Sequence, residues 1–189
     1  MKRQTNTPNL YKFITEELFL PCIPYNTSLV RCFNALPIET KLDVYIDDEL
    51  LGKDLSYKQF SYYIPVLESK THNIKVFISG ENNTPIIDKQ IQLHQSYVET
   101  LSIVGSIESP DILAVVGNPT QQPYPDKSVI RYANLSQSNI VINVSLNNNV
   151  IQSGPLNINE YNEYSLLNPI MYKFDFINYL PKVIVNCIT

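Results

Sequence analysis

The feature of this sequence that most constrains its fold is an internal repeat. Four blocks of the first half return in the same order in the second half: SLVRCFN (28–34) as SVIRYAN (128–134), DVYID (43–47) as NVSLN (143–147), QFSYY (59–63) as EYNEY (160–164), and KVFI (75–78) as KFDF (173–176). The spacing between blocks is nearly the same in both halves. Self-similarity of this kind indicates one structural unit used twice. The sequence therefore predicts two related units in tandem.

Most of the chain alternates apolar and polar residues with a period of two. Residues 42–47 (LDVYID) and 74–78 (IKVFI) are examples, and residues 98–104 and 112–116 form further short apolar runs. Short alternating runs are typical of strands that bury one face. Turn-forming residues such as GENN at 80–83 separate them. We therefore expect an all-β fold, with sandwich or barrel architecture.

The chain divides into four predicted parts: an N-terminal arm (1–27), a first β-sandwich unit (28–118), a Pro-rich linker (119–127) and a second unit (128–189). Apolar residues at helical spacing favour a short helix in the arm, which Pro21 and Pro24 would end. The second unit is truncated, because one hairpin of the first has no counterpart before a final strand at 182–188. We expect the first unit, the arm or another subunit to cover its open edge.

Composition and charge exclude several classes of protein. The chain has 14 basic and 18 acidic residues, a net charge of −4, and only three arginines. Because nucleic-acid binding depends on clustered Lys and Arg, we expect no nucleic-acid partner. No apolar run approaches the length that spans a bilayer, and no secretory signal follows Lys2-Arg3. Frequent Asn, Ile, Tyr and Lys indicate a low-GC bacterium, and we expect synthesis in the cytoplasm without the usual export route.

Candidate catalytic and metal-binding residues are few. His72 and His94 are the only histidines; we expect both in exposed turns, and neither has Cys, Asp or Glu at ligand spacing. The DDE segment at 47–49 offers carboxylates for Ca²⁺, but the second unit has NNN at 147–149. Asp and Asn both favour hairpin turns, so a turn explains both segments better than a metal site. We predict no catalytic residue, no metal, no cofactor and no enzymatic activity.

The three cysteines, Cys22, Cys32 and Cys187, are widely spaced and form no C-x-x-C pair. The favoured interpretation is two buried free thiols and one thiol near the chain end. A Cys22–Cys32 bridge and an intermolecular disulfide are the alternatives.

Four polar positions recur in the repeat: Arg31 and Asn34 in the first unit, and Arg131 and Asn134 in the second. Each arginine is either a charged ligand contact or a structural residue that ties the next loop to the first strand through its five donors. Recurrence in both units favours the structural role.

Tyrosine is frequent, with 13 residues, and four of them fall in the repeated block: Tyr62, Tyr63, Tyr161 and Tyr164. Aromatic side chains stabilise sheets by cross-strand pairing. Exposed tyrosines also serve at interfaces and in stacking on sugars. We treat these four as sheet residues or as contacts for a partner.

Family-like motifs accompany the repeat. Val30-Arg31, Ala35, Pro37 and residues 42–47 follow the pattern VRxxHAsPdaPaVDVYvdG. A second block follows nlaYgevsdYlpVpaGtytvkV, at Leu55, Tyr57, Phe60, Tyr63, Pro65 and residues 74–76. On these residues the chain resembles the domain of unknown function 4397 family, well over 28–118 and more weakly over 128–180. The resemblance implies tandem immunoglobulin-like β-sandwiches on a bacterial envelope or secreted protein, often clostridial, and implies no activity.

Two departures from the family pattern concern polar residues. Asn34 and Asn134 stand where the family has His, and Pro37-Ile38 replaces Pro-Asp. Any polar site that used those residues is lost here. We expect a non-enzymatic structural or adhesion-type module of the spore surface or cell envelope, with other subunits or envelope components as partners and homo-oligomers as one form of assembly. A glycan- or peptide-binding sandwich is the alternative.

Overall fold

The computed structural model describes residues 27–67, 71–81, 83–94, 97–117 and 126–178, and all regular secondary structure in these ranges is β-strand. The expected all-β fold is therefore confirmed. No helix in these ranges is long and apolar enough to cross a membrane. The expected helical arm, most of the Pro-rich linker, the strand at 182–188, Cys22 and Cys187 lie outside the described residues.

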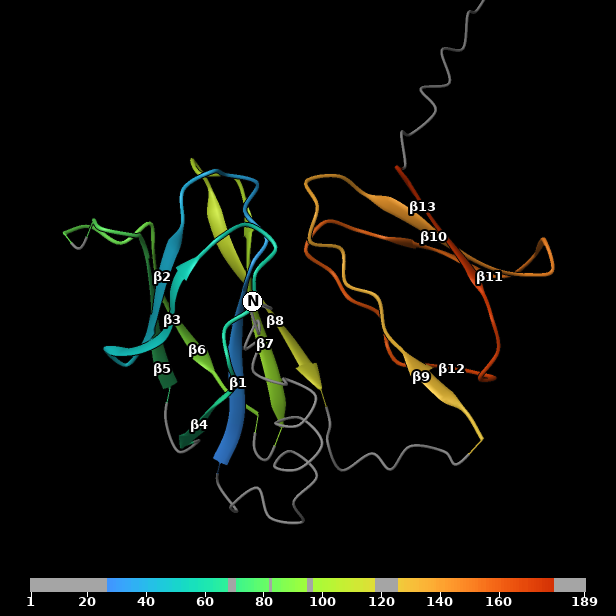
Figure 1. The fold of residues 1–189 in the computed structure, drawn as a ribbon, viewed down its shortest axis with the longest axis horizontal. Helices are drawn as coiled ribbons and strands as arrows, with labels where there is room; N and C mark the ends of the chain where they lie inside the picture. The colour runs from blue at the N-terminus through green and yellow to red at the C-terminus, as the bar shows by residue number, and fades with distance from the viewer. Residues whose placement is uncertain (1–26, 68–70, 82, 95–96, 118–125, 179–189) are drawn as a thin grey trace, which may run out of the picture.

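Residues 27–117, which we call the first unit, form two four-stranded sheets (Figure 1). One sheet has the order β4-β1-β7-β8, with β4 at Ile64–Leu67, β1 at Thr27–Asn34, β7 at Val98–Gly105 and β8 at Pro110–Gly117. The other has the order β3-β2-β5-β6, with β3 at Glu49–Leu55, β2 at Leu42–Ile46, β5 at Thr71–Ile78 and β6 at Ile87–Gln92. Strands β1 and β7 are parallel, and the other pairs are antiparallel.

The core of the first unit lies between its two sheets. Inward-facing residues of both sheets form one buried cluster: Val30, Cys32, Leu36, Leu42, Val44, Ile46, Leu51, Leu55, Ile74, Val76, Ile87, Leu93, Leu101, Ile103 and Ile112. The alternation read from residues 42–47 thus places Leu42, Val44 and Ile46 on the buried face. Two apolar faces packed together in this way define a β-sandwich.

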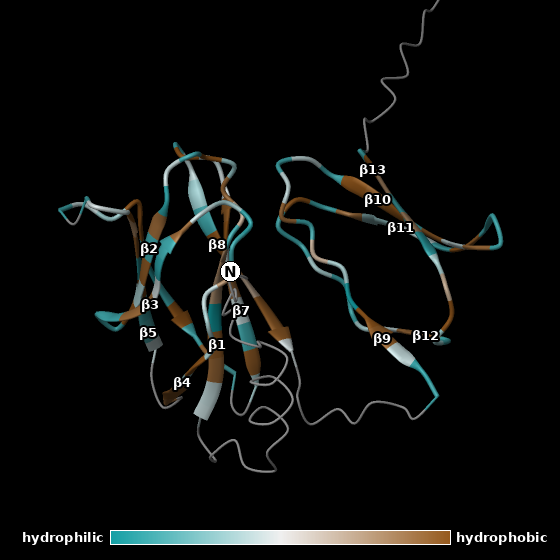
Figure 2. Ribbon diagram, in the orientation of Figure 1, coloured by the Kyte–Doolittle hydropathy of each residue, from teal (hydrophilic) through white to brown (hydrophobic). Residues whose placement is uncertain are grey.

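Residues 126–178, the second unit, form two smaller sheets (Figure 1). A three-stranded sheet has the order β11-β10-β13, with β11 at Asn149–Leu156, β10 at Ile140–Leu146 and β13 at Lys173–Asn178. The other pairs β9 (Ser128–Ile130) with β12 (Ser165–Leu167). Its buried cluster is much smaller: Tyr132, Ile142, Val144 and Leu156. Hydrophobic stretches nevertheless occur in the strands of both units (Figure 2).

Strand pairing follows the same register in the two units. Strand β2 pairs with β5 so that Val44 faces Val76, and β10 pairs with β13 so that Val144 faces Phe174. The β2–β3 and β10–β11 hairpins turn at the DD of 47–48 (φ 49° and 68°) and the NN of 147–148 (φ 50° and 65°). Two successive residues with positive φ are the mark of the type I′ hairpin turn, which favours Asp and Asn. The turn predicted at both segments is confirmed.

The position of His72 differs from the one expected from the sequence. It was expected in an exposed turn, but it lies within β5 and is only 4% exposed. Its Nδ1 is 2.6 Å from Oδ2 of Asp47, in the hairpin turn of the neighbouring strand β2. The carboxylate gives the imidazole a polar partner inside the sheet, so that a histidine is tolerated there. His94 does follow β6 with an exposed side chain, as expected.

Candidate functional site

Arg31 lies in β1 and stacks on two aromatic rings from the segment between β3 and β4. Its guanidinium carbon is 4.2 Å from the ring centroid of Phe60 and 4.6 Å from that of Tyr63. Its Nε donates to the hydroxyl of Thr100 on β7 (3.0 Å). Stacking and hydrogen bonding together fix the direction of this guanidinium.

Arg131 repeats this arrangement immediately after β9. Its guanidinium carbon is 3.8 Å from the ring centroid of Tyr164 and 4.9 Å from that of Tyr161. One terminal amino group donates to the backbone carbonyl of Val116 on β8 of the first unit. Gln137 adds a second link, because its amide donates to the carbonyl of Gly105 (2.7 Å). Arg131 therefore joins the two units as well as stacking within its own.

Asn34 and Asn134 carry the loop-tying role that we expected of the arginines. The Asn34 amide nitrogen donates to the carbonyl of Leu55 (2.9 Å), and its Oδ1 accepts from the amide of Leu36 (3.0 Å). Asn134 likewise donates to the carbonyl of Leu156 (3.1 Å), and its Oδ1 accepts from the backbone amide two residues on (3.0 Å). An amide side chain with both donor and acceptor is needed at this buried position.

The two arginines open onto a single cleft between the units. This inter-unit cleft has a volume of about 300 Å³ and is lined by Arg31, Tyr63, Val98, Thr100, Val115, Gly117, Arg131 and Tyr164. A Cβ atom at Gly117 would lie 3.4 Å from the Tyr164 hydroxyl and 3.3 Å from the carbonyl of Val98. The absence of a side chain at Gly117 thus allows the second unit to approach β7 and β8 closely.

Both guanidiniums carry donors beyond those used in the fold. Among the described residues, no carboxylate lies within ion-pair distance of Arg31, and only its Nε has a hydrogen-bond partner. The Nε of Arg131 is buried and unpaired. Its nearest carboxylate, Glu163, is 3.9 Å away and 96% exposed, so this pair is weak.

Electrostatically, the inter-unit cleft is a cationic site with aromatic and apolar walls. Burial lowers the pKa of Arg31 from its usual value, while the nearby Tyr63 hydroxyl opposes this shift. A guanidinium nevertheless stays protonated in proteins, so both arginines are cations. The site can therefore accept negative charge and offer hydrogen-bond donors.

The four tyrosines singled out from the sequence lie in different surroundings. Tyr62 is 63% exposed and does not line the cleft, whereas Tyr63 and Tyr164 form part of its wall. Tyr161 is half-buried beside Arg131. The recurrence of Arg with Tyr in both repeats could have indicated the stacking, but nothing in the sequence places Thr100 and Gly117 next to both arginines.

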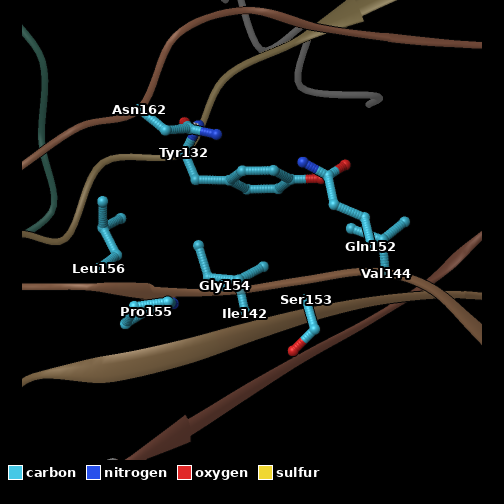
Figure 3. A pocket seen from close by; sticks show the side chains of 9 residues that line it. All are labelled: Tyr132, Ile142, Val144, Gln152, Ser153, Gly154, Pro155, Leu156 and Asn162. Atoms are coloured by element: carbon cyan, nitrogen blue, oxygen red, sulfur yellow. Dashed lines mark hydrogen bonds between the residues drawn. The ribbon is translucent and has the colours of Figure 1, made fainter.

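A smaller cavity of about 130 Å³ lies inside the second unit (Figure 3). The ring of Tyr132 points across it towards Gln152, above Ile142, Val144 and Gly154 (Figure 3). The Tyr132 hydroxyl is buried and unpaired in the described part of the chain, and burial raises its pKa. The residues that line this cavity include apolar and neutral polar side chains but no charged group, so it is not a site where charges converge.

Groups suited to metal binding or catalysis do not cluster in the described ranges. No group of three or more His, Cys, Asp or Glu is arranged there to hold a metal ion. His72 pairs with Asp47, and His94 lies beside the buried Glu99, with 3.2 Å between its Nδ1 and the carboxylate. Cys32 is buried, and burial raises the pKa of its thiol to about 11. The expectation of a buried free thiol at Cys32 is confirmed.

The fold and this site define an all-β, two-sheet sandwich protein with a cationic cleft. Residues 28–145 match the family model described as domain of unknown function (DUF4397). Because the match covers more than half of the chain, the chain belongs to this family, as the motif residues indicated. The match begins in β1 and ends in β10. No curated protein shows a significant match.

Proposed function

We propose that this protein is a non-enzymatic structural or adhesion-type module of the bacterial spore surface or cell envelope, built from two tandem copies of one sandwich unit. The observation that carries the proposal is the framework found in both units: a stacked arginine, a loop-tying asparagine and a two-residue hairpin turn. Residues repeated in this way support a fold that serves as a building block. Serial β-sandwiches are common in cell-surface proteins.

The surroundings of the histidines support a non-enzymatic role. Catalysis by a histidine requires a free nitrogen within reach of a reacting group in an accessible site. His72 is buried in β5 with its Nδ1 against Asp47, and His94 lies against Glu99 outside the inter-unit cleft. The variants His72→Gln and His94→Gln should therefore change the free energy of unfolding, and neither should abolish an enzymatic activity.

Assembly is supported by the exposed apolar residues of the second unit. Phe176 (61% exposed) and Ile177 (49%) lie on β13, which has a strand partner on one side only within the described ranges. An edge strand with exposed apolar side chains favours pairing with another strand.

Two measurements test the proposed function. Light scattering after size-exclusion chromatography should show a defined oligomer of the purified chain, and Phe176→Lys should dissociate it. Proteomics of purified spores and vegetative envelopes should recover the protein in one of these fractions. A monomer at all concentrations would contradict self-assembly, and absence from both fractions would contradict the location.

The inter-unit cleft favours a second candidate function, glycan or peptide binding. Two tyrosines and two arginines surround a volume at the lower end of the roughly 300–1,000 Å³ range of ligand sites. A glycan array combined with a peptide array tests this candidate. Signals at background on both arrays would rule it out.

A further inference from the structure

We propose that the inter-unit cleft binds the carboxylate of an acidic sugar, with Arg31 and Arg131 as its two cationic contacts. This inference rests on the second candidate function and names its ligand class. The pairing of the arginines in one cleft is a property of the folded chain, because they are 100 residues apart in the sequence.

The guanidiniums of Arg31 and Arg131 are fixed in direction and keep unused donors among the described residues. Each side chain is already held in place, Arg31 by Phe60 and Tyr63, and Arg131 by Tyr164 and the carbonyl of Val116. A site oriented in advance loses little conformational entropy when a ligand binds. Guanidinium groups match the planar geometry of carboxylates, and such charge-assisted hydrogen bonds are stronger than neutral ones.

Among the described residues, Glu163 is the carboxylate in ion-pair contact with Arg131. Glu163 lies 3.9 Å from Arg131, beyond hydrogen-bond distance, and is almost fully exposed. Glu163 therefore does not use up the hydrogen-bonding capacity of Arg131, and the buried Nε of Arg131 has no partner among the described residues. A ligand carboxylate between Arg31 and Arg131 would pair with their terminal amino groups, since the Nε of Arg31 already donates to Thr100 and the Nε of Arg131 is buried.

The size and the lining of the cleft suit a short sugar. About 300 Å³ admits one or two sugar rings, and Val98, Val115 and the rings of Tyr63 and Tyr164 offer surfaces for the apolar faces of such rings. The Thr100 and tyrosine hydroxyls can exchange hydrogen bonds with sugar hydroxyls. Two arginines can neutralise only a few negative charges, so a short acidic sugar suits the cleft better than a long polyanion.

The test is isothermal titration calorimetry on the full chain with three probes: a galacturonic acid trimer, a neutral galactose trimer, and a short peptide with a free C-terminal carboxylate. The acidic trimer should bind, and its affinity should fall at high salt because screening weakens charge pairing. Arg31→Gln and Arg131→Gln should each weaken binding roughly tenfold or more. Glu163→Gln, which removes the competing carboxylate, should strengthen it.

Two controls separate loss of the site from loss of the fold. Lys58→Gln removes a cation that lies 4.9 Å from the Tyr57 ring but does not line the cleft, so binding should be unchanged. Gly117→Val retains both arginines and fills the cleft beside Tyr164, so binding should be lost. Circular dichroism must show folded protein for every variant that is scored.

Each outcome distinguishes this inference from the function on which it rests. If the acidic trimer binds and the arginine variants weaken it, the inference holds. If both trimers bind equally, glycan binding stands and the carboxylate site is wrong. If only the peptide binds, the sugar assignment is overturned. If no probe binds, both the inference and the glycan function fail, while the assembly role is unaffected.

Discussion

The glycine of β3 and the glycine of β11 show how differently the two units are packed. A Cβ atom at Gly52 would lie 2.7 Å from Sγ of Cys32 and 2.7 Å from a methyl carbon of Leu55. A Cβ atom at Gly154 would meet nothing within 4 Å, beside the cavity of about 130 Å³. The backbone of β3 is therefore closely packed at Gly52, and that of β11 is loosely packed at Gly154. The two glycines are not matched positions of the repeat, because Gly52 pairs with Val44 and Gly154 with Ile142.

The framework, by contrast, hardly differs between the units. Asn34 and Asn134 make equivalent hydrogen bonds. The backbone amides of Cys32 and Tyr132 likewise donate to side-chain oxygens of the equivalent segment, Oγ of Ser61 and Oδ1 of Asn162. Local hydrogen bonding is therefore set by a few polar residues. Packing depends instead on how many strands cover the core, and the second unit has fewer strands within the described ranges.

The largest expected difference in stability between the units concerns Leu55 and Leu156. Their backbone carbonyls accept hydrogen bonds from Asn34 and Asn134. Leu55→Ala removes a side chain from a full core and should cost about 3–5 kcal/mol of unfolding free energy. Leu156→Ala borders an existing cavity and loses fewer contacts, so about 2 kcal/mol is expected. Denaturant unfolding measures both. An equal or larger effect for Leu156→Ala would contradict the packing difference.

The buried thiol of the first unit predicts a pH dependence. The usual thiol pKa is 9.0, and burial raises that of Cys32 to about 11. Between these values the unfolded chain loses a proton that the folded chain retains, so stability should fall with rising pH, by about 2–3 kcal/mol. Urea unfolding between pH 8 and pH 11 measures this decrease. Cys32→Ala should reduce the slope, and an unchanged slope would show that Cys32 does not cause it.

Substitution of Asn34 and of Asn134 should lower the free energy of unfolding by similar amounts, unlike substitution of the two leucines. Asn34→Ala leaves the amide of Leu36 and the carbonyl of Leu55 without their partner, and about 1–3 kcal/mol is expected. Asn134→Ala should cost a similar amount despite its looser surroundings. Thermal unfolding of both variants tests this. A large effect in one unit and none in the other would mean that the framework is not shared.

Substitutions at the two glycines should act with opposite signs, and the effect at Gly154 should be the smallest. Gly52→Ala forces a shift of Cys32 or Leu55 and should destabilise by about 1–3 kcal/mol. Gly154→Ala should stabilise by about 0.4–1 kcal/mol, because it restricts the unfolded chain and meets no clash. Thermal unfolding measures both changes in stability. A change of the same sign for both variants would contradict the difference in packing.

The sequence was sufficient to predict the all-β fold, the family and both hairpin turns, because alternation and turn preference act locally. It was insufficient for His72, since the pairing of β2 with β5 supplies the carboxylate that makes burial of this histidine tolerable. The inter-unit cleft could not be predicted from the sequence either. Thr100 and Gly117 reach Arg31 and Arg131 only through the β1–β7 pairing and the contact between units, and no local pattern encodes these.

The two units share one hydrogen-bonded framework but differ in the packing of their cores, and this difference can be measured. Hydrogen exchange measured by mass spectrometry tests it most directly, by comparing peptides that cover β2 and β3 with peptides that cover β10 and β11. We expect protected amides in both hairpins, with exchange clearly faster in β10 and β11. Equal protection in the two hairpins, or slower exchange in the second, would contradict it.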